Sequence, residues 1–376
     1  MHAPAGPRRH LEIANYPPPF DGWSTHTKFV VDEIRRRGHV CQVLKINENR
    51  RVRSPEYVDV QSGIDYLIKV IQFAALGYSI NAHVNAESRK GYLIALAAVI
   101  VGRIFLRKAT ITFHGGVPQS HFPAPRSTLW HWKFQALFRL CSGILCDSDE
   151  IKRAIANYGI QPAKISTAAG FSIRNLNYKE VGLGEDLESF LRTHDPTLFC
   201  YLSFRPEYRL EVLRDGMKQF RVSHPRAGFV WLGFPKNEID AARSYVAAFL
   251  PEERESLLVL GNLSHDAFLT LLKRCDVFLR TPACDGVSAS LLEAVALGVP
   301  VVASENGRRP AGVITYAEMD AADMCRKLRG LMQSPRSTVI PQFHPDAGED
   351  SVTATADWLV GRFHNSSGKN QVIAAP

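Results

Sequence analysis

Short apolar segments alternate with helical patterns along almost the whole of this 376-residue chain, and this alternation constrains the fold more than any other feature. In the first half, strands are expected at residues 11–15, 40–46, 109–113 and 144–146. Helical patterns lie at residues 25–37, 91–102, 126–140 and 149–158. Strands that alternate with helices form parallel sheets, because each helix carries the chain back to the starting edge of the sheet. The first half is therefore predicted to be a doubly wound parallel α/β domain.

The same alternation resumes after a polar stretch at residues 173–196, which lacks a strong strand pattern. Further strands are expected at residues 198–204, 228–233, 257–260, 277–280 and 299–303. We therefore predict a first domain at residues 1–180 and a second at 181–345. A C-terminal helix at residues 346–364, expected to cross back to the first domain, precedes a flexible tail at 365–376. Two such domains facing each other enclose a cleft, and ligands of parallel sheets bind beyond the carboxyl ends of the strands.

The net charge of +8 is confined to the first half of the chain. Residues 1–190 carry 24 Lys and Arg against 16 Asp and Glu, whereas residues 191–376 carry 21 of each. A basic half suggests an anionic partner, such as a nucleic acid, a phospholipid surface or a phosphorylated substrate. Solubility alone explains the excess equally well at this point.

The segment at residues 276–300, DVFLRTPACDGVSASLLEAVALGVP, carries the strongest chemical signal. An apolar strand runs into a loop with Asp285 and Gly286, and Glu293 follows in a helix for which Ser288 is a suitable N-cap. The free N–H groups and positive dipole end of a helix N-terminus suit a phosphate. A glycine in the loop lets the backbone approach a ligand closely. The two carboxylates can therefore hold different parts of one ligand.

In this segment, DGVSASLLEA followed by GVPVVAS resembles the E-x7-E region of the group 1 (family four) retaining glycosyltransferases, which have the GT-B fold. Three earlier segments resemble that family in the same order: YPPPFDGWSTHTKFVVDEIRRRGHVCQVL, ITFHGG and CDSDEIKRAIANYGIQPAKISTAAGFS. The resemblance spans residues 11–320. It implies two Rossmann-like domains facing a cleft, with the acceptor on the first and the nucleotide-sugar on the second.

The resemblance also implies roles for residues of the second domain. Glu293 would accept hydrogen bonds from the ribose hydroxyls, and Asp285 would lie beside the donor sugar. Ser290 would reach a phosphate with its hydroxyl. Backbone contacts to sugar and diphosphate would come from Gly286, Val287 and Ser288. The first acid is Asp where the family has Glu, so its loop must come closer to the ligand or its contact must change.

The expected diphosphate clamp departs from the family pattern in YLSFRPEYRLEVL. Arg209 falls where the family has Lys, whereas Ser203 occupies the usual Arg position and Arg205 follows two residues later. A departing diphosphate requires fixed positive charge, so we expect Arg205 and Arg209 to act together. The alternative is that Arg205 pairs with Glu207 or another surface acid.

Two first-domain positions complete the expected site. His114 ends an apolar strand beside two glycines, and by resemblance it would lie near the donor sugar and act in catalysis with Asp285 and Arg209. A local role for His114 in a turn is the alternative. Gly22, in the first loop, would let the backbone approach the donor phosphate.

The helix expected at residues 126–140 mixes aromatic residues with Lys133 and Arg139. Such a helix can lie at an anionic membrane surface, and core packing explains its aromatics about as well. The longest apolar run, residues 92–101, is about half of the ~20 residues that span a bilayer. No secretory signal is visible, and the seven cysteines form no CxxC pair. A cytoplasmic protein, peripheral on the inner membrane face, is expected.

These features together predict a retaining glycosyltransferase of the hexosyltransferase type. It would move a sugar from a nucleotide-sugar to a hydroxyl of a glycan or lipid-linked acceptor in cell-surface polysaccharide biosynthesis. No metal motif or cofactor motif is present, so neither group is expected. One alternative is an inactive GT-B relative that binds a nucleotide-sugar or a partner protein. An epimerase or phosphorylase on the same fold, and a nucleic-acid binder, are less well supported because no motif indicates them.

Overall fold

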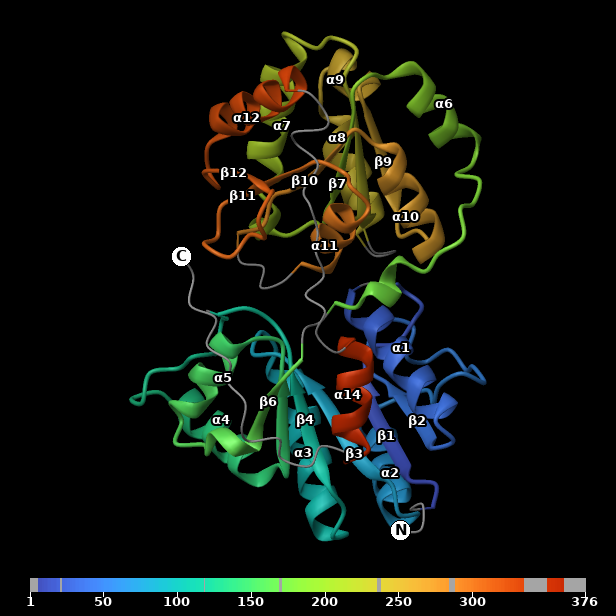
Figure 1. The fold of residues 1–376 in the computed structure, drawn as a ribbon, viewed down its shortest axis with the longest axis vertical. Coiled ribbons are helices and arrows are strands. Elements are labelled where there is room, and N and C mark those ends of the chain that lie inside the picture. Colours follow the sequence, from blue (N-terminus) through green and yellow to red (C-terminus); the bar gives the residue numbers. More distant parts are fainter. Residues whose placement is uncertain are drawn as a thin grey trace, which may run out of the picture.

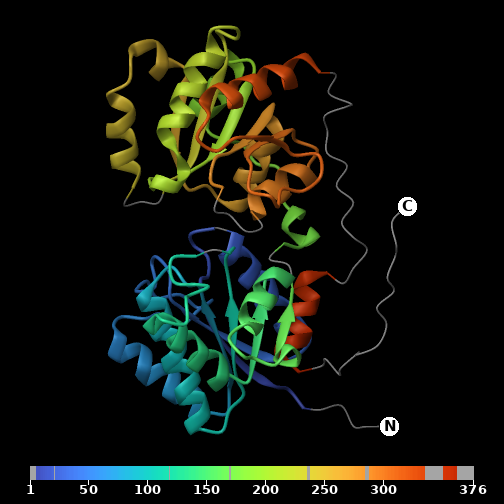
Figure 2. The same ribbon diagram turned by 90° about the vertical axis from the view of Figure 1, so that its left-hand side faces the viewer.

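The protein consists of two α/β domains stacked end to end (Figure 1), seen in a computed structural model. The structure describes residues 6–20, 22–117, 119–168, 171–234, 238–283, 288–334 and 350–361. Each domain contains a six-stranded sheet in which every strand pairing is parallel. Figure 2 shows the two domains from the side, one above the other.

The first sheet has the strand order β2-β1-β3-β4-β5-β6. Its elements in chain order are β1 (Arg9–Ala14), α1 (Gly22–Arg36), β2 (Val40–Lys45), α2 (Gly63–Ala75), β3 (Ser79–Val84), α3 (Arg89–Ile104), β4 (Ala109–Phe113), α4 (Leu129–Leu140), β5 (Gly143–Cys146), α5 (Asp149–Ala156), the 3-10 turn η1 (Pro162–Lys164) and β6 (Ile165–Thr167). One apolar core joins the sheet to α2, α3, α4 and α5, and a second joins it to α1. Both faces of the sheet are therefore covered, and its strands still alternate, as in β3, where Ile80 and Ala82 lie next to the polar residues Asn81 and His83.

The second sheet has the order β12-β11-β10-β7-β8-β9. Its elements are η2 (Ile173–Leu176), α6 (Glu185–Thr193), β7 (Thr197–Tyr201), η3 (Pro206–Tyr208), α7 (Leu210–Arg221), β8 (Gly228–Phe234), α8 (Ile239–Ala247), α9 (Pro251–Glu255), β9 (Leu257–Gly261), α10 (His265–Arg274), β10 (Val277–Arg280), α11 (Ala289–Ala296), β11 (Val301–Ser304), β12 (Ile314–Tyr316) and α12 (Ala321–Gln333). Two cores lie on opposite faces of this sheet. The doubly wound pair of domains expected from the sequence is thus present.

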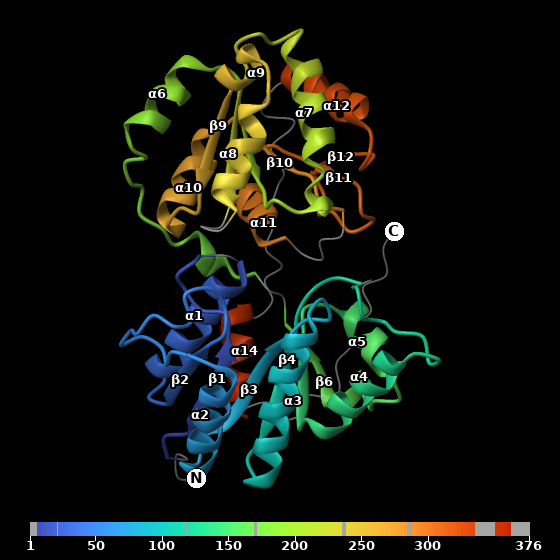
Figure 3. The same ribbon diagram turned by 180° about the vertical axis from the view of Figure 1, so that it is seen from behind.

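The last described helix, α14 (Ser351–Leu359), lies on the first domain, far in sequence from the strands it covers (Figures 1 and 3). Val352 and Ala356 of α14 share a buried cluster with Val30 and Ile34 of α1. The chain therefore returns to its starting domain after it has completed the second one.

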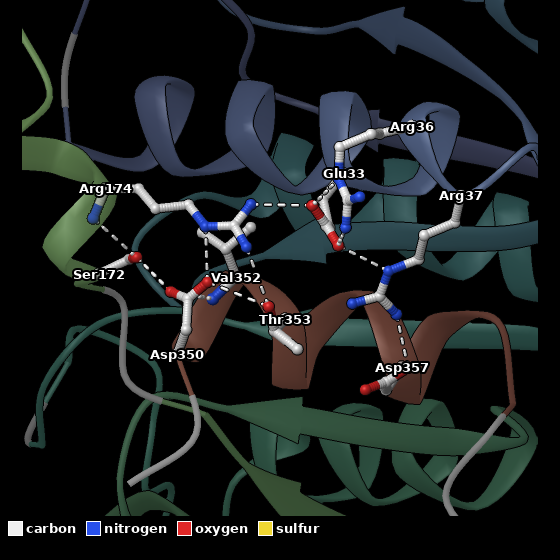
Figure 4. Close-up of polar contacts among 9 residues, drawn as sticks. All are labelled: Glu33, Arg36, Arg37, Ser172, Arg174, Asp350, Val352, Thr353 and Asp357. Atoms are coloured by element: carbon white, nitrogen blue, oxygen red, sulfur yellow. Dashed lines mark hydrogen bonds and ion pairs between the residues drawn. The ribbon is translucent and has the colours of Figure 1, made fainter. Parts of the chain in front are cut away.

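A buried carboxylate ties α1 to the segment between the domains (Figure 4). Glu33 accepts hydrogen bonds from Arg36 at 2.7 Å, Arg37 at 2.7 Å and Arg174 at 2.9 Å. The hydrogen bond from Arg36 holds the pKa of Glu33 well below its usual range, joined by those from Arg174 and Arg37 and opposed by burial. The carboxylate is thus charged at neutral pH, as three guanidinium partners require.

The same arginines extend the connection to α14 (Figure 4). Arg37 donates to Asp357 at 2.5 Å, and Arg174 pairs with Asp350 at 2.6 Å. The Ser351 hydroxyl donates to the Phe171 carbonyl at 2.6 Å. Both chain crossings between the domains, at residues 171–174 and 350–351, are therefore fixed to one end of the first domain.

Candidate active site between the domains

A cleft of about 650 Å³ separates the two domains and is lined by both of them. Its lining residues follow the carboxyl ends of strands: Asn15, Phe20, Gly22, Trp23, Asn85, Glu87, Gly115, Gly116 and Asp147 in the first domain, and Tyr201, Arg205, Tyr208, Asn262, His265, Arg280, Ser288, Ser290 and Glu293 in the second. This is where open parallel sheets bind ligands. The volume lies within the range of small-molecule sites.

The wall formed by α11 carries three residues expected from the sequence. Ser288 is the N-cap residue of α11, and its hydroxyl lies 3.2 Å from that of Ser290. Glu293, in the second turn, is buried but reaches the cleft. Nε2 of His265, at the start of α10, lies 3.2 Å from a Glu293 carboxylate oxygen. A helix N-terminus with two hydroxyls and a held carboxylate suits a ligand that combines phosphate with hydroxyl groups.

Gly22 lies directly against α11, although the two belong to different domains. A methyl group at Gly22 would lie 2.8 Å from the Cβ of Ala289. The absence of a side chain at residue 22 therefore allows α1 and α11 to approach each other closely. The three remaining residues expected here, Asp285, Gly286 and Val287, lie outside the described residues, and their roles stay predictions.

The cations of the site are arranged differently from the sequence expectation. Arg205 is exposed and lines the cleft, and in the described part of the chain no ion pair joins it to Glu207. Arg209 does not line the cleft: its guanidinium donates to Glu318 at 3.0 Å. Arg280, at the end of β10, is a buried cation that lines the cleft and donates to the Tyr201 carbonyl at 3.1 Å.

Sequence reasoning missed Arg280. Its signal was present, because a charged residue ends the otherwise apolar strand VFLR at the edge where ligands bind. The rings of Tyr201 and Tyr208 lie 5.9 and 5.4 Å from its guanidinium carbon. A cation held in this way has a fixed position, which favours charge stabilisation in a reaction.

His114 lies beneath the floor of the cleft rather than in its wall. Its ring stacks on Trp23 with centroids 4.6 Å apart, and Trp23 lines the cleft above it. His114 also lines a small cavity of about 20 Å³ with Glu12, His26 and Asp147. His114 therefore reaches the cleft through the neighbouring Asp147, which lines both spaces.

A chain of hydrogen bonds leads from the cleft into the sheet through His114. Asp147 lies 3.3 Å from Nδ1 of His114, whose Nε2 lies 2.9 Å from Nδ1 of His83. Nε2 of His83 lies 3.0 Å from the buried carboxylate of Glu12. Each of the three hydrogen bonds requires one proton, and two neutral imidazoles supply only two. All three contacts therefore cannot be hydrogen bonds at once while both rings are neutral and both carboxylates are ionised.

The inner end of this chain of hydrogen bonds is a charged carboxylate. Burial would raise the pKa of Glu12, but hydrogen bonds from His10 and His83 outweigh it and lower the pKa to about 2. Burial lowers the pKa of His83. The Glu12 carboxylate is therefore ionised at neutral pH, at the end of the hydrogen-bond chain that lies away from the cleft.

The α4 helix divides the aromatic residues that suggested a membrane contact. Phe134 and Phe138 are buried in the core, whereas Trp132 is exposed. Among the described residues, no helix has both the length and the apolar character needed to cross a bilayer. In that same part of the chain, no three His, Cys, Asp or Glu side chains are arranged so that they could hold a metal ion.

Solved structures with this fold are numerous, and three illustrate it. Anabaena HepE in complex with UDP and glucose aligns with a TM-score of 0.64 at 14% identity, covering 94% of this chain and 96% of its own. Sucrose-phosphate synthase from Thermosynechococcus elongatus gives 0.66 at 12% identity, with 94% and 95% covered. The α,α-trehalose 6-phosphate synthase from Burkholderia multivorans gives 0.61 at 12% identity, with 94% of each chain covered.

The two described domains therefore have the GT-B fold, as expected from the sequence. Residues 186–319 match the family model described as "Glycosyl transferases group 1". This stretch is a group 1 glycosyl transferase domain, and the protein is a glycosyltransferase. A comparison with curated proteins found no match. Membership of family four in particular stays a prediction.

Proposed function

We propose that this protein transfers a sugar from a nucleotide-sugar to a hydroxyl of a glycan or lipid-linked acceptor, with retention of the anomeric configuration. The observation that carries the proposal is Glu293, a buried carboxylate that opens onto the interdomain cleft within the segment matching the group 1 family. Solved structures of HepE with UDP and with UDP-glucose support a uridine nucleotide as the first donor to test.

In this proposal the second domain holds the donor. Glu293, kept in place by His265, accepts hydrogen bonds from the ribose hydroxyls. The N-terminus of α11, with Ser288 and Ser290, faces the diphosphate. Asp285, Gly286 and Val287 are proposed to contact the donor sugar and the diphosphate.

Positive charge for the leaving diphosphate comes from arginines in the proposed mechanism. Arg205 and Arg280 line the cleft, and a bidentate guanidinium matches phosphate geometry. Arg209 joins them when the diphosphate competes with Glu318 for its guanidinium. These cations and the helix N-terminus supply charge stabilisation, so the proposal includes no metal ion or cofactor.

The acceptor is proposed to enter from the first domain, above Trp23 and Asp147. Its hydroxyl oxygen forms a bond to the anomeric carbon on the face that the diphosphate leaves, and the bond from that carbon to the diphosphate oxygen breaks. The departing diphosphate takes the hydroxyl proton, so no carboxylate nucleophile is required. His114 orients the site through Asp147 and Trp23. Closure of the domains excludes water that would otherwise hydrolyse the donor.

The product's stereochemistry tests this proposal. The purified protein is incubated with UDP-glucose or another UDP-sugar and a panel of glycan and lipid-linked acceptors, and released UDP and the new linkage are measured. We expect UDP release that depends on the acceptor, and an α linkage from the α-configured donor in the NMR spectrum. A β linkage would contradict retention. Donor binding without UDP release across the panel would support the inactive relative instead.

We further propose that the reaction serves cell-surface polysaccharide assembly at the inner face of a membrane. The basic first half of the chain is consistent with an acceptor presented at an anionic surface.

A further inference from the structure

The outer face of the first domain exposes an unusual number of large apolar side chains. Helices α2, α3 and α4 lie next to one another on this face (Figure 3), with α3 between the other two. Of the 20 exposed large apolar residues in the described chain, 12 belong to residues 64–140. Exposed apolar residues are normally scattered, so this concentration indicates an interaction surface.

Helix α2 is apolar on two of its sides. Tyr66, Val70 and Ala74 face the core. An adjoining side presents an exposed stripe at i, i+3, i+4 and i+7, formed by Ile64, Leu67, Ile68 and Ile71. Ile64 is 75% exposed. Packing in the core does not explain the second stripe, because all four of its side chains are exposed.

Helix α3 continues the apolar surface. Leu93, Ile100 and Ile104 form an exposed stripe along it, and Ile104 is 70% exposed. Leu106, in the loop that follows, is 92% exposed and has a φ of 54°. A leucine rarely adopts this left-handed conformation, and here it holds a large apolar side chain in water.

The exposed charged side chains on these three helices are all positive. Exposed cations lie on α3 and α4: Arg89, Lys90, Arg103 and Arg139. The acid in the three helices is Asp65, which is partly buried and paired with Lys69 at 2.9 Å. The surface therefore offers aliphatic side chains and positive charge together, without exposed negative charge on α2, α3 or α4.

We propose that the face formed by α2, α3 and α4 is the surface by which this protein binds an anionic lipid bilayer. Aliphatic side chains enter the boundary between headgroups and acyl chains, while the cations pair with anionic headgroups. A second copy of the chain fits less well. A two-fold contact through this face would place the α3 cations of one copy near those of the other, with no exposed acid on these helices to compensate.

The position of this face relative to the cleft agrees with a bilayer partner. Asn85 and Glu87 line the cleft, and α3 begins two residues later at Arg89. The lipid-binding surface therefore begins at the edge of the cleft. The inference rests on the exposed residues of the first domain, so it stands or falls separately from the proposed sugar transfer.

Flotation of the full-length chain with vesicles tests the proposal. We expect binding to phosphatidylcholine vesicles that contain 30% phosphatidylglycerol, and at least about tenfold weaker binding by the triple variant I64S/I68S/I104S. The double variant R89Q/K90Q should bind about 25-fold more weakly, since each cation near such a surface contributes about fivefold. A matched control is V222S/L250S, which removes two exposed apolar side chains from the second domain and should bind like the wild type.

Three outcomes would overturn the proposal: no flotation of the wild type with anionic vesicles, equal flotation of the triple variant, or equal binding to pure phosphatidylcholine. Sedimentation equilibrium without lipid tests whether a second copy of the chain binds this face instead. A wild-type dimer that the triple variant converts to a monomer would assign this face to a second copy. In the absence of vesicles, the triple variant should bind UDP as well as the wild type does. If the wild type binds vesicles but does not bind UDP, the proposed function is refuted and the proposed lipid-binding surface still stands.

Discussion

The close approach of Gly22 to α11 makes Gly22→Ala a sensitive test of the interdomain site. The new methyl group would lie 2.8 Å from the Cβ of Ala289. Carbon atoms in contact lie about 3.5 Å apart or more, so α1 and α11 must separate by about 0.7 Å (3.5 minus 2.8). Ala289 Cβ is attached directly to the backbone, so no flexible side chain can absorb this displacement.

The cost of the displacement falls on the paired domains rather than on either core, because the contact joins different domains. Inserting a methyl group into a packed contact costs about 1–3 kcal/mol. If that cost opposes the closed arrangement in which transfer occurs, turnover falls about 5- to 150-fold. The folding stability of each domain should change little, since Ala is a better helix former than Gly.

The assay is the rate of UDP release from the donor in the presence of acceptor, with thermal unfolding measured in parallel. Gly63→Ala is a matched control, because Gly63 is the first residue of α2 and its added methyl group would meet nothing within 4 Å. We expect wild-type turnover from Gly63→Ala and reduced turnover at an unchanged melting temperature from Gly22→Ala. Equal turnover of both variants would refute the argument that α1 and α11 act as opposing walls of one site.

Three further predictions concern charged residues. Arg280→Ala should lower turnover about 10²- to 10³-fold, as expected for loss of a fixed charge at the leaving group. Arg209→Ala should lower turnover less, because the Arg209 guanidinium pairs with Glu318. Equal losses of kcat/KM in the two variants would contradict this ranking. The pKa of Glu12 is about 2 in the folded protein against 4.5 ordinarily, so it contributes about 3 kcal/mol of stability above pH 4.5 that is lost as the pH falls toward 2. Urea unfolding should show a smaller loss of stability in acid for Glu12→Gln than for the wild type, with the rest of the loss coming from other carboxylates such as Glu33. Glu33→Gln should destabilise the protein by about 3 kcal/mol in the same assay, because it leaves three guanidinium groups facing an uncharged side chain. Asp357→Asn should cost less than about 1 kcal/mol, because the Asp357 side chain is more exposed than that of Glu33.

The sequence predicted best those elements that carry their own local signal. The strands at residues 109–113 and 277–280 coincide with β4 and β10, because each is a short apolar run between polar turns. The helix expected at residues 149–158 is present as α5, since its apolar residues recur on one face. The class of fold followed from the order of such segments.

The helices and strands that were not predicted from the sequence lack a regular spacing of apolar residues. Helix α2 is apolar on two sides, so its pattern resembles neither an amphipathic helix nor an alternating strand. Strands β6 and β12 have three residues each, and their pairing with neighbouring strands defines them. The local sequence does not predict a strand whose formation depends on pairing with neighbouring strands.

Part of the candidate site depended on contacts between distant residues. Glu12 and His83 meet because β1 pairs with β3 in a particular register, and no pattern within either strand indicates it. Arg209 was expected in the cleft, but its side chain is held by Glu318, which is distant in the sequence. Glu293 could be anticipated, because the strand–loop–helix that carries it is one continuous segment.

The central claim is that the cleft holds a nucleotide diphosphate with Glu293 as its ribose ligand, and calorimetric titration with UDP tests it most directly. We expect the wild type to bind UDP and Glu293→Ala to bind it about 10- to 150-fold more weakly, the effect of losing hydrogen bonds to a charged group. Glu87→Ala, which removes a carboxylate from the opposite wall, should bind UDP like the wild type. Unchanged affinity in Glu293→Ala, or no binding by the wild type, would contradict the account.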